Sequence, residues 1–190
     1  MNLSKDTDIT GIILAGGKSR RMGEEKGLKL HLGKPFISYI IRALETITNK
    51  IFIITKNEDY EVFGYPCISD DFPNLGPVGG IYTGLKNTLT SQNLILSCDI
   101  PFITPSVLQE LVLKSDSDYD VITYEKTPLV SLYKSTVLPI FLESIRQNRL
   151  SLFRTMAALK VKNIQIRNDI RPFLENINTQ QQYQEAIQWN

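Results

Sequence analysis

The hydrophobic positions of this chain follow two alternating periods. Short runs of apolar and β-branched residues are typical of strands buried on both faces. Between them lie longer segments in which apolar residues recur every three or four positions, which is typical of amphipathic helices. The runs that predict strands are 9–15, 50–55, 66–68, 93–97, 119–124, 128–133 and 161–166. The segments that predict helices are 35–49, 78–89, 105–114, 136–147, 151–159 and 179–188.

This alternation of strands and helices predicts an α/β fold with a mostly parallel sheet covered on both faces. The segment 35–49 illustrates the helical pattern, because Ile37, Ile40 and Leu44 fall on one face that can pack on the sheet. Pro35 stands at a plausible first helical position, where its missing N–H does no harm. Ligands of such sheets gather beyond the carboxyl ends of the strands, so the loops that follow the strands are where function is expected.

Length and composition narrow the class of protein. A chain of 190 residues with 42% hydrophobic content can bury a substantial core, and we expect one domain over 1–190. The formal net charge of +1 argues against nucleic acid or an anionic membrane as a partner. There is no long apolar run and no apolar segment at the N-terminus, so we expect neither a membrane span nor a secretory signal. We therefore expect a cytoplasmic location. Cys67 and Cys98 are widely separated and the chain has a single His, so we expect reduced thiols and no zinc site.

The first predicted strand runs directly into a basic, glycine-containing stretch. Glycines allow backbone N–H groups to approach an anion closely, and cations offset the desolvation of phosphates. The stretch does not have the spacing of a Walker A loop or of the G-x-G-x-x-G dinucleotide fingerprint, which disfavours a conventional kinase or NAD site. A polyanion site is therefore predicted here, with a solvated basic turn as the alternative. The residues concerned are Gly16, Gly17, Lys18, Arg20, Arg21 and Lys26.

A second feature is the sequence "LILSCDIPF", in which the strand 93–97 is followed by Asp99 and stopped by Pro101. A carboxylate just beyond a buried parallel strand lies at the ligand edge of the sheet, where it can hold Mg²⁺ together with phosphate oxygens. An ordinary turn aspartate is the alternative. Taken with the basic loop, Asp99 predicts phosphoryl or nucleotidyl transfer.

A third feature is the loop 68–80, which is rich in Gly, Pro and Asp. Its Gly76-Pro77 and Gly79-Gly80 pairs can bring bare backbone close to a flat base, although a rigid structural turn would have the same composition. His31 lies between two apolar residues in a short strand or turn. Because no nucleophile or metal partner is near it in the sequence, we expect no catalytic role for it.

These motifs also carry a family resemblance. "LAGGKSRRMGEEKGLKLHLGKP", "LGPVGGI", "LSCDIPF", "TPLVSLY" and "FLENINT" resemble, in order and spacing, the molybdenum cofactor guanylyltransferases of the nucleotidyltransferase superfamily. The resemblance implies a three-layer α/β/α, Rossmann-like fold of the nucleotide-diphospho-sugar transferase type. It also implies Mg²⁺-dependent transfer of GMP from GTP to molybdopterin with release of pyrophosphate. Other cofactor-biosynthesis proteins or molybdoenzymes are possible further partners.

Two other functions stay open, because the first motif also fits other branches of the superfamily. One is a nucleotidyltransferase that uses CTP or a sugar phosphate, and the other is a nucleotide-binding module without catalysis. The molybdopterin branch is favoured by "NINT" at 176–179, although Gln180 stands where the family has proline. Glu25 replaces the aspartate of the family motif.

The resemblance assigns roles residue by residue. Leu14, Ala15, Gly16 and Gly17 would contact the nucleotide, Lys26 its phosphates, Asp70 the nucleoside, and Asp99 the Mg²⁺. Arg20 or Arg21 would join Lys26 in stabilising the departing pyrophosphate, and Thr55 takes the place of an asparagine that contacts the nucleoside. A carboxylate can accept from the N1–H and N2 amino group of guanine, so we expect Asp70 to favour guanine. We expect Lys26, Asp99 and Arg20 to carry catalysis.

Overall fold

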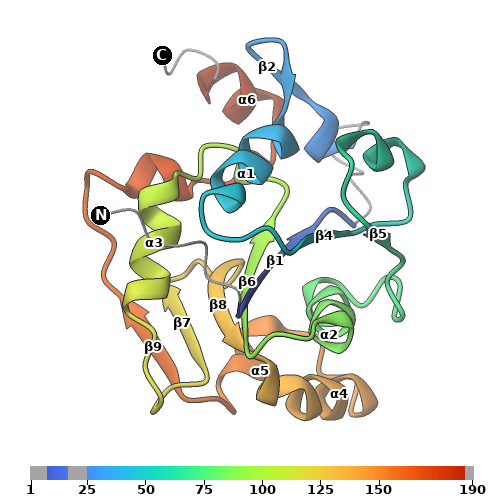
Figure 1. Cartoon of the computed structure of the whole chain (residues 1–190), viewed down its shortest axis with the longest axis vertical. Helices are drawn as coiled ribbons and strands as arrows, with labels where there is room; N and C mark the ends of the chain where they lie inside the picture. Colours follow the sequence, from blue (N-terminus) through green and yellow to red (C-terminus); the bar gives the residue numbers. More distant parts are fainter. Residues whose placement is uncertain (1–7, 17–24, 187–190) are drawn as a thin grey trace.

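The computed structural model describes residues 8–16 and 25–186. A seven-stranded sheet runs across the molecule in the order β5-β4-β1-β6-β8-β7-β9, and β2 and β3 form a separate hairpin (Figure 1). The strands are β1 (Ile9–Leu14), β2 (Leu30–His31), β3 (Lys34–Pro35), β4 (Ile51–Ile54), β5 (Cys67–Ile68), β6 (Gln92–Ser97), β7 (Val121–Tyr124), β8 (Val130–Lys134) and β9 (Val161–Ile164).

Helices connect most of these strands. The α-helices are α1 (Phe36–Glu45), α2 (Pro77–Asn87), α3 (Pro105–Leu113), α4 (Leu138–Arg146), α5 (Leu152–Met156) and α6 (Gln180–Ala186). Short 3-10 helices cover η1 (Lys26–Leu28), η2 (Glu58–Phe63), η3 (Ser135–Val137) and η4 (Arg171–Leu174). Every predicted helix and strand is therefore present, and most are shorter than the pattern suggested, whereas β6 is one residue longer than the predicted 93–97. Within the described residues, no helix has both the length and the apolar character that crossing a bilayer requires.

The sheet is mostly parallel, as predicted, with one exception. β1 pairs in parallel with β4 and β6, β4 with β5, and β7 with β9. β8 runs antiparallel to both β6 and β7. A parallel pair needs a crossover of about a dozen residues or more, and the turn between Tyr124 and Val130 is too short for one. The short turn between β7 and β8 therefore reverses the chain.

The two faces of the sheet bury separate apolar clusters, which makes three layers. Figure 1 shows α1 and α3 on one face and α2, α4 and α5 on the other. Alternation along β1 sends Ile13 into the first cluster and Ile12 into the second, and both side chains are fully buried. A Cβ on Gly84 would lie 2.8 Å from Cγ2 of Ile12, so this glycine lets α2 lie close to the sheet.

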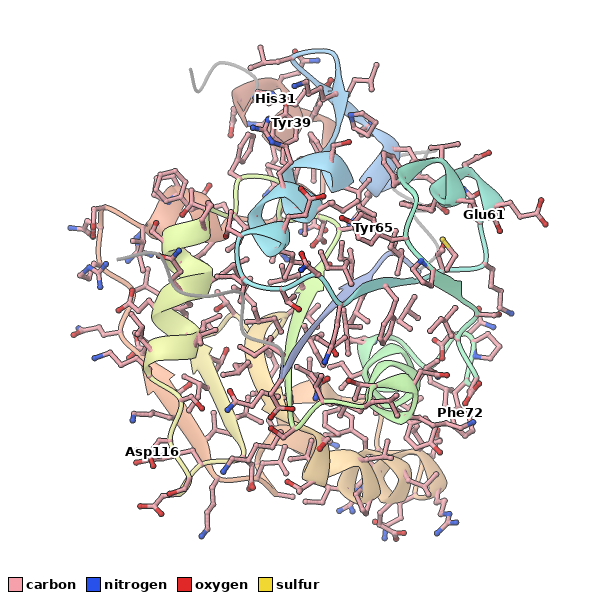
Figure 2. The ribbon with its side chains drawn as sticks, viewed as in Figure 1. His31, Tyr39, Glu61, Tyr65, Phe72 and Asp116 are labelled. Carbon is pink, nitrogen blue, oxygen red and sulfur yellow. The ribbon has the colours of Figure 1, made fainter. Side chains whose placement is uncertain are left out.

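A small third cluster joins three distant segments above the sheet. Phe36 and Ile177 are buried in it, with Phe102 and Tyr183 packed against them. Figure 2 shows His31 and Tyr39 beside each other at the hairpin, where the Tyr39 hydroxyl donates to the His31 carbonyl at 2.6 Å. The cluster ties the β2–β3 hairpin, the turn after β6 and the start of α6 to one another.

The start of α1 differs from the prediction. The helix begins at Phe36, and Pro35 is its N-cap residue and the last residue of β3. The Phe36 N–H donates to the Lys29 carbonyl at 2.8 Å, so the residue before the hairpin satisfies the first backbone N–H of the helix, which has no partner within the helix. Proline still serves the same purpose, because it has no N–H that would need a partner.

Candidate active site

The carboxyl ends of the central strands meet at one edge of the sheet. The Ala15 N–H donates to the Ile54 carbonyl at 3.0 Å, and the Cys98 N–H donates to the Leu14 carbonyl at 3.1 Å. The strands β1, β4 and β6 therefore end at the same level of the sheet. A cavity of about 760 Å³ opens there, called here the first cavity, with Ala15, Gly16, Glu25, Asp70 and Gly76 among its lining residues. Its size is typical of a small-ligand or nucleotide site.

Lys26 and Asp99 lie beside each other at this edge. The Lys26 Nζ is 3.4 Å from Asp99 Oδ2 and also donates to Asn178 Oδ1. The side chains of Lys26 and Asp99 are 21% and 13% exposed, so their attraction is only partly screened by water. Asp99 Oδ1 is buried and has no hydrogen-bond partner among the described residues. A buried carboxylate oxygen without a donor is costly, and a bound cation would remove that cost.

Asp99 has the properties expected of a magnesium ligand, because it is a carboxylate with one buried oxygen that accepts no hydrogen bond from the described residues. Mg²⁺ prefers one or two carboxylates together with substrate phosphate oxygens, and does not need an all-protein cage. Across residues 8–16 and 25–186, no group of three or more His, Cys, Asp or Glu side chains could hold a metal ion. One inward-facing carboxylate with a free oxygen therefore agrees with a Mg²⁺ that arrives with a nucleotide.

Local packing holds Lys26 in place. A Cβ on the next residue, Gly27, would lie 2.6 Å from Tyr60 Oη and 3.2 Å from Cys98 Cβ, so only glycine fits between β6 and η2. The Tyr60 hydroxyl donates to Glu25 Oε2 at 3.2 Å. Tyr60 is fully buried, so it anchors the segment that carries Lys26 to the loop after β4.

Asn178 belongs to the site although its role was not predicted from the sequence. The Ile177 N–H donates to the Asp99 carbonyl at 2.8 Å, which places Asn178 beside Lys26. Thr179 Oγ1 accepts from the Gln182 N–H at 3.1 Å, and Gln182 Oε1 accepts from the Thr179 N–H at 3.1 Å, which is a capping box at the start of α6. The "NINT" sequence was the available signal, and it was used only for the resemblance.

The site contains no activated thiol. Burial, together with the neighbouring carboxylates of Asp99 and Glu25, raises the pKa of Cys98 to about 12, so the thiol stays neutral at physiological pH. Burial also raises the pKa of Tyr60 well above its ordinary value. Neither group can serve as a nucleophile near neutral pH.

Asp70 lies on the wall of the first cavity in a fixed orientation. Its Oδ1 accepts from Thr83 Oγ1 and from the Phe72 N–H, both at 2.9 Å. A Cβ on Gly79 would lie 2.7 Å from the Phe72 carbonyl and 3.3 Å from Asp70 Oδ2. These contacts leave Asp70 Oδ2 without a hydrogen bond to the described residues, so it can accept from a ligand.

The expectation that Gly79 and Gly80 face a base is wrong. Both are buried inside α2, which begins at Pro77, so the loop ends at Gly76. A Cβ on Gly80 would lie 3.3 Å from Leu14, because this turn of the helix packs on the end of β1. Only Gly76, with a φ of 65°, keeps the role that was predicted for the loop glycines, since it lines the first cavity.

The remaining predicted residues fall into three groups. Ala15, Gly16 and Thr55 line the first cavity. Leu14 is buried in the apolar cluster below it, and its carbonyl is bonded to Cys98. Thr55 is also buried, with its hydroxyl accepting from the Asn57 N–H at 3.1 Å. Gly17, Arg20 and Arg21 lie outside the described residues.

The fold is the one found in solved structures of nucleotidyltransferases. Molybdopterin-guanine dinucleotide biosynthesis protein A from Archaeoglobus fulgidus superposes with a TM-score of 0.77 at 21% identity, covering 94% of this chain and 97% of that chain. A nucleotidyl transferase from Methanothermobacter superposes with a TM-score of 0.76 at 15% identity, covering 95% and 96%. These structures confirm the predicted nucleotide-diphospho-sugar transferase type of fold.

The chain belongs to the family of the MobA-like NTP transferase domain, whose model matches residues 11–162. A probable molybdenum cofactor guanylyltransferase from Flavobacterium johnsoniae is 40% identical over 90% of this chain and 92% of its own length. Another from Carboxydothermus hydrogenoformans is 30% identical over 95% of both chains. The resemblance predicted from the motifs is therefore confirmed.

Proposed function

We propose that this protein is a molybdenum cofactor guanylyltransferase that transfers GMP from GTP to molybdopterin and releases pyrophosphate. The relatives that share at least 30% identity over nearly the whole chain carry that name. The observation that carries the proposal is the meeting of Lys26 and Asp99 next to a nucleotide-sized cavity. Lys26 and Asp99 are 73 positions apart in the sequence, so the fold alone brings them together.

The first cavity is the proposed GTP site. Gly16 is exposed at the end of β1, and its backbone can approach the phosphates without a side chain in the way. Lys26 then exchanges its contact with Asp99 for the phosphates of GTP. An ammonium that is only 21% exposed keeps much of its attraction for such a charge.

The proposed reaction is a displacement at the α-phosphorus of GTP. A phosphate oxygen of molybdopterin forms the new bond to phosphorus, the bond to the β-phosphate oxygen breaks, and pyrophosphate leaves with the bonding electrons. The acceptor phosphate is already anionic at neutral pH, so no side chain has to remove a proton from it. Catalysis therefore depends on alignment and on stabilising the charge of the transition state.

The side chains contribute to charge and position. Lys26, held by Asn178, stabilises the pyrophosphate as it leaves. Asp99 would hold Mg²⁺ through its free Oδ1, and the ion would supply positive charge to the phosphate oxygens. Arg20 is proposed as a second cation.

Asp70 is the proposed guanine-selecting residue. Guanine presents N1–H and an N2 amino group as donors, and Asp70 Oδ2 is an acceptor held by the hydrogen bonds of its partner oxygen. Cytosine would leave this acceptor with a poorer match. GTP is accordingly proposed over CTP.

The location and further partners of the protein belong to the same proposal. We expect it to work in the cytoplasm, where other cofactor-biosynthesis proteins or molybdoenzymes would supply the acceptor or receive the product.

The experiment combines substrate choice with a matched pair of variants. The protein is incubated with Mg²⁺, molybdopterin and either GTP, CTP, ATP or UTP, and both pyrophosphate and the mass of the dinucleotide product are measured. GTP should give the guanine dinucleotide at the highest kcat/KM, and Asp99→Asn should abolish turnover while Asp118→Asn, an exposed carboxylate elsewhere, leaves it unchanged. Preferred use of CTP would move the protein to another branch of the superfamily, and GTP binding without pyrophosphate release would indicate a binding module.

A further inference from the structure

Tyr60 links two parts of the first cavity that lie far apart in the sequence. Its backbone belongs to η2, where the Tyr60 N–H donates to the Asn57 carbonyl at 3.3 Å. Its hydroxyl donates to Glu25 Oε2 at 3.2 Å, across 35 positions of the chain. Asn57 and Glu25 both line the first cavity, so Tyr60 joins the wall that follows β4 to the segment that carries Lys26.

The position of the Tyr60 side chain is well defined. Asn57 Oδ1 accepts from the Asp59 N–H at 2.9 Å and caps η2, and the Asn57 N–H donates to Thr55 Oγ1 at 3.1 Å. The Tyr60 side chain is fully buried, and its ring centroid lies 6.2 Å from that of Phe63. Because a close-packed interior leaves such a side chain little freedom, its hydroxyl is a fixed point in the structure.

The Tyr60 hydroxyl is also a permanent donor. Burial, together with the neighbouring Cys98 and Glu25, raises the pKa of Tyr60 well above its ordinary value, so the hydroxyl keeps its proton at physiological pH. A buried tyrosine hydroxyl needs a hydrogen-bond partner, and Glu25 provides one. Since the acceptor is a carboxylate, the bond is stronger than one between two neutral groups.

The Glu25 carboxylate needs to be held because of where it lies. It lines a cavity that is proposed to bind a triphosphate, and it directly precedes Lys26 in the chain. Glu25 forms no ion pair with any described residue, whereas the Lys26 ammonium lies 3.4 Å from Asp99 Oδ2. A Glu25 carboxylate that was free to turn toward the ammonium would compete with the phosphates for it, because opposite charges attract strongly in a partly buried site.

We propose that Tyr60 is a positioning residue, whose hydroxyl holds the Glu25 carboxylate away from Lys26 and so leaves the ammonium free to bind the phosphates of the nucleotide. This inference rests on the proposed function and adds a residue to its machinery. Tyr60 is fully buried and is not among the residues that line the first cavity, so it acts through Glu25 and not on the substrate.

The test removes the hydroxyl in three backgrounds. Tyr60→Phe is made in the wild type, in Glu25→Gln, which lacks the competing charge, and in Lys26→Met, which lacks the group that Glu25 would capture. Tyr65→Phe is the matched control, because the Tyr65 hydroxyl donates to Glu45 Oε1 at 2.6 Å outside the first cavity. For each protein, kcat/KM for GTP is measured with molybdopterin and Mg²⁺. The affinity for inorganic pyrophosphate with Mg²⁺, measured by calorimetry, gives the same comparison without catalysis.

Tyr60→Phe should lower both kcat/KM and the affinity for pyrophosphate by about tenfold in the wild-type background, the factor expected for one hydrogen bond to a charged group. The same change should have less than about a twofold effect in the Glu25→Gln and Lys26→Met backgrounds, because Tyr60 acts only through these two residues. Tyr65→Phe should match the wild type. A tenfold loss that persists in either background, or no loss in the wild-type background, would overturn the positioning role.

Stability and the proposed function are judged separately from this role. All proteins are compared at a temperature at which circular dichroism shows each of them to be folded, so a loss of stability alone does not change the result. If the wild type forms no dinucleotide from GTP and molybdopterin, the proposed function fails, whereas the pyrophosphate affinities still decide the role of Tyr60. Absence of pyrophosphate binding by the wild type would overturn both.

Discussion

Replacing Gly27 by alanine tests the packing that holds Lys26. The new Cβ would lie 2.6 Å from Tyr60 Oη, 3.1 Å from Tyr60 Cε1 and 3.2 Å from Cys98 Cβ. The first distance is too short for any contact, and Tyr60 is fully buried and cannot swing away. Overpacking of this kind costs about 1–3 kcal/mol. For a protein of this size that corresponds to a fall in Tm of about 2–12 °C.

The activity of Gly27→Ala should fall by more than its stability implies. Lys26 is the preceding residue, and its Nζ is positioned between Asp99 Oδ2 and Asn178 Oδ1. Relief of the clash moves the backbone of η1, so the ammonium loses its alignment with the phosphates. We expect kcat/KM to fall by about 10²-fold at a temperature where the variant is folded, since a misplaced charge-stabilising group costs about that much.

A second substitution makes the explanation testable. Tyr60→Phe removes the oxygen that clashes, at the expense of the hydrogen bond to Glu25, which is worth about 1 kcal/mol. The double variant Gly27→Ala/Tyr60→Phe should therefore be more stable than the sum of the two single changes predicts, and thermal unfolding of all four proteins gives that coupling. Strictly additive losses of stability, or a Gly27→Ala protein with wild-type Tm and activity, would refute this reasoning.

Three further outcomes follow from the same contacts. Gly16→Ala should leave Tm unchanged, because the nearest atom to the new Cβ is the Ile54 carbonyl oxygen at 3.8 Å, but it should raise the KM for GTP; a normal KM would remove Gly16 from the phosphate site. Lys26→Met should lower kcat/KM by about 10²–10³, whereas Lys34→Met, at an exposed hairpin position, should not, and equal effects would discredit the role of Lys26. Burial lowers the pKa of His31 from 6.5, so the unfolded chain binds a proton that the folded one does not as the pH falls through about 6.5. Tm should accordingly drop further between pH 7.5 and 5.5 in the wild type than in His31→Leu, and parallel curves would contradict this.

The sequence was most informative where a local pattern decides the structure. Apolar runs such as 93–97 predicted the strands of the large sheet, because a strand that is buried on both faces needs apolar side chains at nearly every position. The antiparallel direction of β8 was harder to predict. It depends on the short turn after Tyr124, which is visible in the sequence, and on the pairing of β8 with β6, which joins segments far apart in the chain. The β2–β3 hairpin, with two residues in each strand, is too short to leave a period at all.

The candidate site could be predicted one residue at a time, but its assembly could not. Lys26 and Asp99 each follow from a local motif, and the parallel sheet explains why both lie at one edge. Asn178 joins them only because Ile177 is buried against Phe36 and bonded to the Asp99 carbonyl, a contact between segments far apart in the chain. Gly79 and Gly80 show the opposite error, in which glycines needed for helix packing were taken for ligand contacts.

The central claim is that Asp99 and Lys26 hold the same triphosphate, and a crystal structure with Mg²⁺ and the α,β-methylene analogue of GTP tests it most directly. The analogue resists cleavage at the bond that the reaction breaks, so the donor complex can be captured. We expect the triphosphate in the first cavity, Mg²⁺ on Asp99 Oδ1, and the Lys26 ammonium moved from Asp99 onto a phosphate oxygen. A triphosphate bound with Asp99 and Lys26 still paired to each other and out of reach of its oxygens would contradict it.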